Sequence, residues 1–235
     1  MAEKPVMVGD KIEVRYDIKR WELLKRFRKK AIKIMEVLSR FGISTIVHGS
    51  LARGDVKDSS DVDIFIPYVV SSFLIENALG EIKTDFFSRE IVQATPQYAP
   101  KAYIYLEDKV GVSFPLVNLR RLENDFYYFG GALSLEGVKQ EKRVSGVNKR
   151  LMLIEPTTHG HLESPVVGRE AIVAKILGVS LDIVNQRVRV LMKRDKIGRT
   201  GVYLKKVLRK NDNFEQILKK IADKDSVVRN RMRIN

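Results

Sequence analysis

Two short apolar runs rich in β-branched residues, with a polar loop between them, constrain the fold of this chain most. Ile43-Ser44-Thr45-Ile46-Val47 and Val62-Asp63-Ile64-Phe65-Ile66 both have the composition of a buried strand, and Pro67 ends the second run. The polar residues 48–60 join them. The two runs therefore predict neighbouring strands of a sheet.

Helices are predicted before and after these runs. Trp21, Leu24, Phe27 and Ala31 begin a series that extends to Leu38 and predicts a long helix, with Lys and Arg on its other face, that Gly42 ends. Further along the chain we expect helices at 71–79 and 118–129 and strands at 102–106, 110–114 and 150–154. The sequence therefore predicts an α+β fold.

Composition excludes several classes of protein. With 44% hydrophobic residues and no apolar run near the roughly 20 residues that span a bilayer, the 235-residue chain is typical of a globular protein. The first residues, Met1 to Pro5, lead into no apolar segment, so we expect no secretory signal and a cytoplasmic location. Because the chain has no Cys, disulfides, thiol catalysis and Cys-ligated zinc are excluded.

Positive charge is concentrated in the last third of the chain. The 43 Lys and Arg residues against 29 Asp and Glu give a net charge of +14. Residues 1–165 contribute +3 of this charge, and residues 166–235 contribute +11. Such an excess is typical of a protein with a polyanionic partner, so we expect nucleic acid to bind the C-terminal part.

The loop at 48–63 carries the residues best suited to chemistry. Gly49-Ser50 follows a strand and can bring backbone N–H groups and a hydroxyl to an anion. Asp61 and Asp63 share one face of the next strand, where two close carboxylates favour a bound cation. Oxygen ligands of this kind suit Mg²⁺ together with substrate phosphates, which indicates phosphoryl or nucleotidyl transfer.

The same residues resemble a known family. The run from Gly49-Ser50 to Asp61-Val62-Asp63-Ile64, with Ala52-Arg53-Gly54 in its loop, is similar to the signature of the DNA polymerase beta-type nucleotidyltransferases. The resemblance covers residues 43–66 directly. It implies that Gly49, Ser50 and Arg53 bind a nucleoside triphosphate, that Asp61 and Asp63 are catalytic and hold Mg²⁺ or Mn²⁺, and that pyrophosphate leaves.

The family pattern also has a third carboxylate on a later strand, and this chain departs from it. The equivalent outward position on the strand at 110–114 is Ser113. Glu107 and Asp108 lie in the neighbouring turn, and Asp85 and Glu90 lie on a segment without a clear prediction. The sequence therefore favours nucleotide binding over turnover, because turnover requires a third carboxylate that the sequence does not identify.

The three histidines have competing interpretations. His48 precedes Gly49 and either touches a phosphate or packs locally. His159 and His161 suggest a metal site, but the spacing favours a loop between domains.

The basic end of the chain resembles a DNA-binding module. Residues 169–193 predict two helices around Gly178-Val179-Ser180, and Lys196 to Leu204 predict a β wing, so a winged helix is expected at about 166–210. The side chains expected to meet nucleic acid are Asn185, Gln186, Arg189, Lys193 and Arg199. A further helix is expected at 214–223, with a mobile basic end at 229–233.

These observations predict two domains, a nucleotidyltransferase domain at 1–165 and a winged-helix domain at 166–235. The expected activity moves a nucleoside monophosphate from a triphosphate to a hydroxyl on nucleic acid or protein. The alternative is a DNA-binding regulator in which the first domain senses nucleotides. An enzyme that modifies a small molecule ranks last, because such a substrate would not require the basic C-terminal part.

Overall fold

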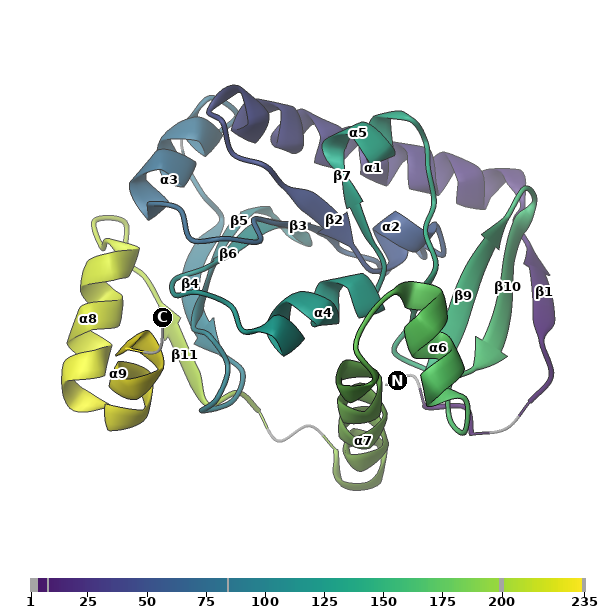
Figure 1. Ribbon diagram of the computed structural model, residues 1–235. Coiled ribbons are helices and arrows are strands. Elements are labelled where there is room, and N and C mark those ends of the chain that lie inside the picture. The colour runs from purple at the N-terminus through teal and green to yellow at the C-terminus, as the bar shows by residue number, and fades with distance from the viewer. Residues whose placement is uncertain (1–3, 8, 84, 199–200, 234–235) are drawn as a thin grey trace. The chain divides into compact units, whose positions relative to one another are not determined.

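The computed structural model describes residues 4–7, 9–83, 85–198 and 201–233, which form two compact units (Figure 1). Of the described residues, unit 1 contains 4–30, 47–60 and 124–198. Unit 2 contains 31–46, 61–123 and 201–233. The chain therefore passes from one unit to the other several times.

Three elements contain a point where the chain changes unit, namely α1 (Ile18–Arg40), β2 (Ile46–His48) and α4 (Arg121–Phe129). Unit 1 also holds β1 (Ile12–Arg15), α2 (Ser50–Arg53), β7 (Ala132–Ser134), α5 (Leu135–Lys139), β8 (Gly146–Val147), β9 (Met152–Thr157), β10 (Gly160–Pro165), α6 (Glu170–Leu177) and α7 (Leu181–Ile197). Unit 2 holds β3 (Val62–Phe65), α3 (Ser72–Gly80), β4 (Ser88–Gln93), β5 (Lys101–Glu107), β6 (Val110–Pro115), β11 (Leu204–Val207), α8 (Phe214–Lys224) and α9 (Ser226–Arg233).

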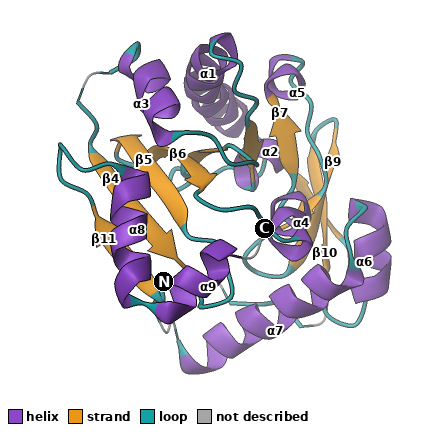
Figure 2. Ribbon diagram, turned by 60° about the vertical axis from the view of Figure 1, so that its left-hand side comes forward, coloured by secondary structure: helices purple, strands orange, loops and turns teal. Residues whose placement is uncertain are grey.

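Five strands of unit 2 lie in one sheet in the order β11, β4, β5, β6 and β3, the first four of which are labelled in Figure 2. Strand β3 runs parallel to β6, and the other neighbours are antiparallel. The predicted strands and helices of this region are confirmed, apart from shifts of a few residues at their ends. Strands β4 and β11 were not predicted, because each has only two apolar residues beside a pair of charged ones.

One face of this sheet is apolar and buried. It carries alternate residues of every central strand, among them Val62, Ile64, Ile104, Val112 and Phe114, each at most 2% exposed. The ring of Phe214 in α8 meets the ring of Phe114 edge-on, with centroids 5.6 Å apart. Helix α8 therefore covers this face, and the alternation leaves the polar residues of β3, β5 and β6 on the other.

Arg89 of β4 fixes the C-terminal segment to the sheet. Its guanidinium is buried, lies 2.6 Å from Glu76 Oε1 and donates to the carbonyl oxygens of Arg209, Lys210 and Asp212. The residues just before this segment form β11, which pairs with β4 as an edge strand. The predicted wing is therefore not what the structure shows: the described residues after α7 lead into the sheet of unit 2.

The basic end of the chain is also ordered differently from the prediction. Residues 229–233 belong to α9, and Arg231 is 2% exposed. Its Nη2 lies 2.8 Å from Glu123 Oε2 and 2.7 Å from the carbonyl oxygen of Asn118. The prediction of a mobile end was wrong, because a buried carboxylate holds the helix.

Unit 1 contains a second, antiparallel sheet and the predicted helix pair. The sheet has the order β1, β10, β9 and β8. Helices α6 and α7 meet at Gly178, whose φ of 64° is easily reached only by glycine, and Ser180 Oγ caps α7 by accepting the N–H of Ile183. The two helices and their turn are confirmed.

The predicted domains, residues 1–165 and 166–235, remain a prediction about function. Residues 166–198 belong to unit 1 and residues 201–233 to unit 2, so compactness alone marks no boundary at residue 165. Across the residues that the structure describes, no helix has the length and apolar character needed to cross a membrane.

Candidate active site

Gly49 and Ser50 form the predicted turn at the start of α2. Gly49 has a φ of 71°, and no atom lies within 4 Å of the place where a side chain would begin. Its N–H donates to the carbonyl oxygen of Gly131 at 2.9 Å. Ser50 Oγ donates to Ser60 Oγ at 3.3 Å. The turn therefore leaves open space beside Gly49, but the Gly49 N–H already has a protein acceptor.

Arg53 lies in the same turn and is buried. Its guanidinium donates to the carbonyl oxygen of Gly130 at 2.6 Å and to Asp55 Oδ2 at 3.0 Å. From α1, Arg28 donates to the carbonyl oxygens of Leu51 and Ala52. Burial lowers the pKa of Arg28 to about 10, which still leaves it charged at neutral pH. These two arginines hold α2 in place, and the predicted contact of Arg53 with a nucleotide remains a prediction.

Asp61 and Asp63 lie at the start of β3, as predicted. Asp61 directly precedes the strand and is exposed, while Asp63 is half-buried and opposite Gly111 of β6. Val62 and Ile64 point into the core. The strand therefore presents both carboxylates on the polar face of the sheet.

Two tyrosines of β5 lie on that same face. Tyr105 pairs with Gly111, and Tyr103 pairs with Ser113 one row further along. A side chain at Gly111 would begin 3.0 Å from Tyr105 Cδ1, so the Tyr105 ring leans over this glycine. The ring is thus next to the strand that carries Asp63.

The tyrosine hydroxyls remain protonated at neutral pH. The pKa of Tyr103 is raised to about 12 by burial and by the nearby Tyr105, Asp63 and Glu90. Burial raises the pKa of Tyr105 too, and the carboxylates of Glu90, Asp63 and Asp61 add to that rise. Both residues therefore offer hydroxyl donors next to the acidic pair.

None of the predicted candidates completes a three-carboxylate site. Glu90 lies on the polar face, but β4 is three strands from β3, which is about 14 Å at the usual strand spacing. Its Oε2 lies 2.7 Å from Lys205 Nζ. Asp85 is exposed and paired with Lys210, and Glu107 and Asp108 stand at the end of β5 and in the turn after it.

Within the described part of the chain, no three His, Cys, Asp or Glu side chains are grouped as a metal site requires. Asp61 and Asp63 alone still fit Mg²⁺, because this ion is commonly held by one or two carboxylates, with phosphate oxygens of the substrate and water completing its octahedron.

Lys101 is a basic residue of this face that the sequence did not single out. It lies on β5 two residues before Tyr103, and its Nζ is 5.6 Å from the centroid of the Phe65 ring. Phe65 follows Asp63 on the same face of β3. Burial lowers the pKa of Lys101 to about 8, against the opposing effect of Glu123.

The histidines have local partners. His48 meets the ring of Tyr127 edge-on, with centroids 5.0 Å apart. His161 is buried in β10, where its Nδ1 lies 2.7 Å from Tyr16 Oη, and His159 is in the turn before that strand. The interpretation of His159 and His161 as an interdomain loop was wrong, because they belong to the β9–β10 hairpin.

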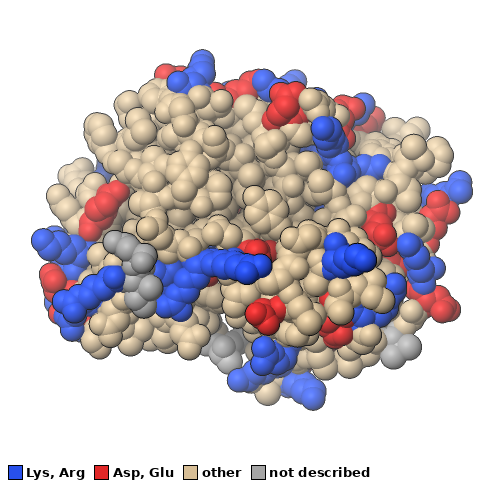
Figure 3. Space-filling view, viewed as in Figure 1, with Lys and Arg blue, Asp and Glu red and all other residues tan. Residues whose placement is uncertain are grey.

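The predicted nucleic-acid contacts of α7 lie on its outer side. Asn185, Arg189 and Lys193 are exposed and Gln186 is partly exposed, while Ile183, Val184, Val188 and Leu191 form the buried stripe. Arg199 lies outside the described residues. In Figure 3, Lys and Arg side chains gather over α8 and over the lower end of α7.

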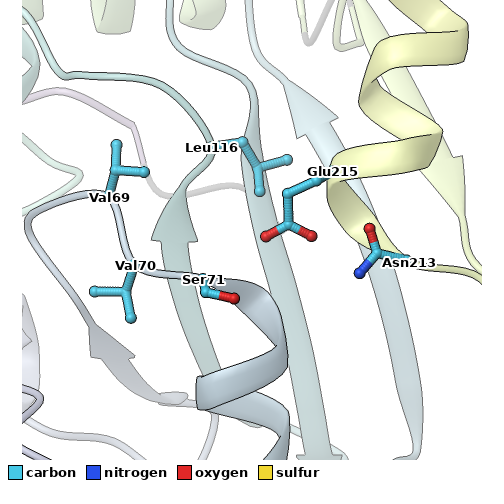
Figure 4. Close-up of a pocket in the computed structure, with 6 residues that line it drawn as sticks. All are labelled: Val69, Val70, Ser71, Leu116, Asn213 and Glu215. Carbon is cyan, nitrogen blue, oxygen red and sulfur yellow. The ribbon is translucent and has the colours of Figure 1, made fainter.

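A cavity of about 420 Å³ lies in unit 2, away from the predicted site residues. It lies where the N-termini of α3 and α8 meet, and Glu215 points from α8 toward Ser71 at the start of α3 (Figure 4). Glu215 accepts the N–H and the hydroxyl of Ser72. Its lining consists of Val69, Val70, Ser71, Leu116, Asn213 and Glu215. A carboxylate already caps α3, so this cavity does not suit an anion.

Comparison with known proteins gives one match. No curated protein and no solved structure is significantly similar to the chain. One family model does match it, over residues 28–121, a segment that runs from within α1 into the start of α4 and includes Gly49, Ser50, Asp61 and Asp63. That model is described as a nucleotidyltransferase domain, and residues 28–121 of this chain are similar to it.

Proposed function

We propose that this chain is a nucleotidyltransferase that moves a nucleoside monophosphate from a nucleoside triphosphate to a hydroxyl group. The observation that carries the proposal is the pair Asp61 and Asp63 on the polar face of β3, within the segment that matches a nucleotidyltransferase domain. In this reaction the acceptor hydroxyl gives up its proton to solvent, its oxygen bonds to the α-phosphorus, the bond from that phosphorus to the oxygen that bridges to the β-phosphate breaks, and pyrophosphate leaves.

Asp61 and Asp63 would hold Mg²⁺ or Mn²⁺ together with phosphate oxygens of the nucleotide. The bound ion would neutralise charge on the phosphates as pyrophosphate departs. Ser50 is proposed to donate its hydroxyl to the triphosphate, and the open space beside Gly49 supports a close approach of ligand to backbone.

Nucleic acid is the proposed carrier of the acceptor hydroxyl. The net charge of +14 and the exposed Arg189 and Lys193 of α7 support it. A regulator that binds nucleotide without transferring it would show the same basic surface, so transfer itself must be measured.

The experiment is label transfer. The protein is incubated with Mg²⁺, total cellular RNA and each nucleoside triphosphate labelled at the α-phosphate. Label in the RNA that is lost in Asp61→Asn and Asp63→Asn, but kept in Asp58→Asn, supports the proposal; Asp58 is an exposed carboxylate of the same loop. Absence of transfer to RNA, DNA or protein by the unmodified chain contradicts it.

A further inference from the structure

We propose that Tyr103 and Tyr105 form a stacking site for unpaired bases of a single-stranded nucleic acid, next to the Asp61–Asp63 pair. This inference rests on the proposed function only in naming the acceptor. The binding it describes requires neither a metal ion nor a nucleoside triphosphate.

The pairing of the strands puts the two rings beside the acidic pair. Asp63, Gly111 and Tyr105 form one row across β3, β6 and β5. Ser113, Tyr103 and Glu90 belong to the next row along the same face. A nucleic acid that follows these rows from Tyr103 to Tyr105 therefore arrives at Asp63.

The two rings lie nearly parallel to each other. Their planes are 15° apart and their centroids are 6.2 Å apart, and both side chains are only partly buried. Gly111 has no side chain to lift the Tyr105 ring from the sheet. Aromatic rings that are accessible on a sheet bind bases by stacking, and this tolerates any base sequence.

Two lysines on the same face can contact phosphates. Lys101 and Lys205 belong to the row beyond Tyr103, on β5 and β11. Glu90 lies in this region too, with its carboxylate 2.7 Å from Lys205 Nζ, so these two charges offset each other. Because both tyrosine hydroxyls stay protonated at neutral pH, they can also donate to sugar or phosphate oxygens.

Two aromatic rings with lysines in the adjoining row favour single-stranded nucleic acid over a peptide acceptor. A base presents a π-face to each ring while its phosphates meet the lysines. In a duplex the bases inside the helix are already stacked on both faces, so they offer these rings no free π-face.

The test is equilibrium binding of a fluorescent single-stranded RNA of about 12 nucleotides, within the span of single-strand sites. Metal and nucleoside triphosphate are left out. Tyr105→Leu and Tyr103→Leu should each weaken binding about 5- to 150-fold, the range expected for the loss of one stacked base. Tyr105→Phe should bind within about twofold of the unmodified chain, because it keeps the ring.

Two controls separate stacking from misfolding. Tyr128→Leu removes an exposed tyrosine of α4 and should leave binding unchanged. Gly111→Ala should weaken binding by displacing the Tyr105 ring, yet add nothing in a Tyr105→Leu background. A duplex of the same sequence should bind the Leu variants and the unmodified chain equally.

The proposal is overturned if both Leu variants bind single strands normally, if Tyr105→Phe loses as much affinity as Tyr105→Leu, or if duplex binding falls in parallel. Label transfer is scored separately, so a chain that binds single strands through these rings but transfers no label contradicts the proposed function and not this site.

Discussion

One buried ion pair holds the last helix, α9, in place. From the sequence, Arg229 to Arg233 read as a solvated basic tail, because Lys and Arg are seldom buried. Arg231 is nevertheless enclosed, and its partner Glu123 is more than a hundred positions away. Local sequence has no signal for such a pair, since neither residue predicts the other.

Arg231→Met should lower the free energy of unfolding by about 3 kcal/mol, since it leaves the buried Glu123 carboxylate without its cation. Urea denaturation measures this change. Arg233→Met, two residues further on and exposed, should stay within about 0.5 kcal/mol of the unmodified chain. Equal effects of the two substitutions would contradict the role given to Arg231.

The buried His161 predicts a dependence of stability on pH. Burial lowers the pKa of His161 in the folded chain below its ordinary value, so the unfolded chain takes up the proton first. Stability should therefore fall as pH drops below about 6.5. The fall, followed by thermal unfolding from pH 7 to 5, should be smaller in His161→Gln, and an identical fall would contradict this assignment.

At the scale of elements, strands with strong apolar patterns were predictable and charged strands were not. The alternation of β3, β5 and β6 is visible in the sequence because their buried positions are Val, Ile, Ala, Leu and Phe. Strand β4 hides its pattern because Arg89 points to the buried face and is neutralised there by Glu76. Strand β11 contains Lys205 and Lys206, which are typical of an edge strand but do not by themselves predict a strand.

Gly160 shows how closely β1 packs on β10. A side-chain carbon there would lie 1.9 Å from the carbonyl oxygen of Val14. Gly160→Ala should therefore separate the two strands and increase hydrogen exchange at residues 12–15. Gly80→Ala, where no atom lies within 4 Å, is the matched control and should leave that exchange unchanged. Unaltered protection of β1 in Gly160→Ala would contradict the pairing.

At the scale of the whole molecule, some residues of the candidate site could be predicted from the sequence, and others are brought together only by the pairing of strands. Gly49, Ser50, Asp61 and Asp63 are close in sequence, so their spacing alone indicated the chemistry. Tyr103, Tyr105 and Lys101 join Asp63 on one face only through the pairing of β3 with β6 and of β6 with β5. Long-range pairing of this kind leaves no local pattern.

The net charge of +14 predicts salt-sensitive binding of nucleic acid. Affinity for RNA should fall steeply between low and moderate salt, as counterion release requires. Replacing Arg189 and Lys193 of α7 together by Gln should reduce the slope of log affinity against log salt by about 2, roughly 1 for each phosphate contact. A slope unchanged in this variant would place the nucleic acid elsewhere on the molecule.

The most direct test of the account is the stoichiometry of the reaction. A nucleoside triphosphate carrying one label at the α-phosphate and another at the γ-phosphate is incubated with the protein, Mg²⁺ and single-stranded RNA. The account predicts one released pyrophosphate, holding the γ-label, for each α-label that enters the RNA, and neither event in Asp63→Asn. Release of inorganic phosphate instead of pyrophosphate, or incorporation that persists in Asp63→Asn, would contradict it.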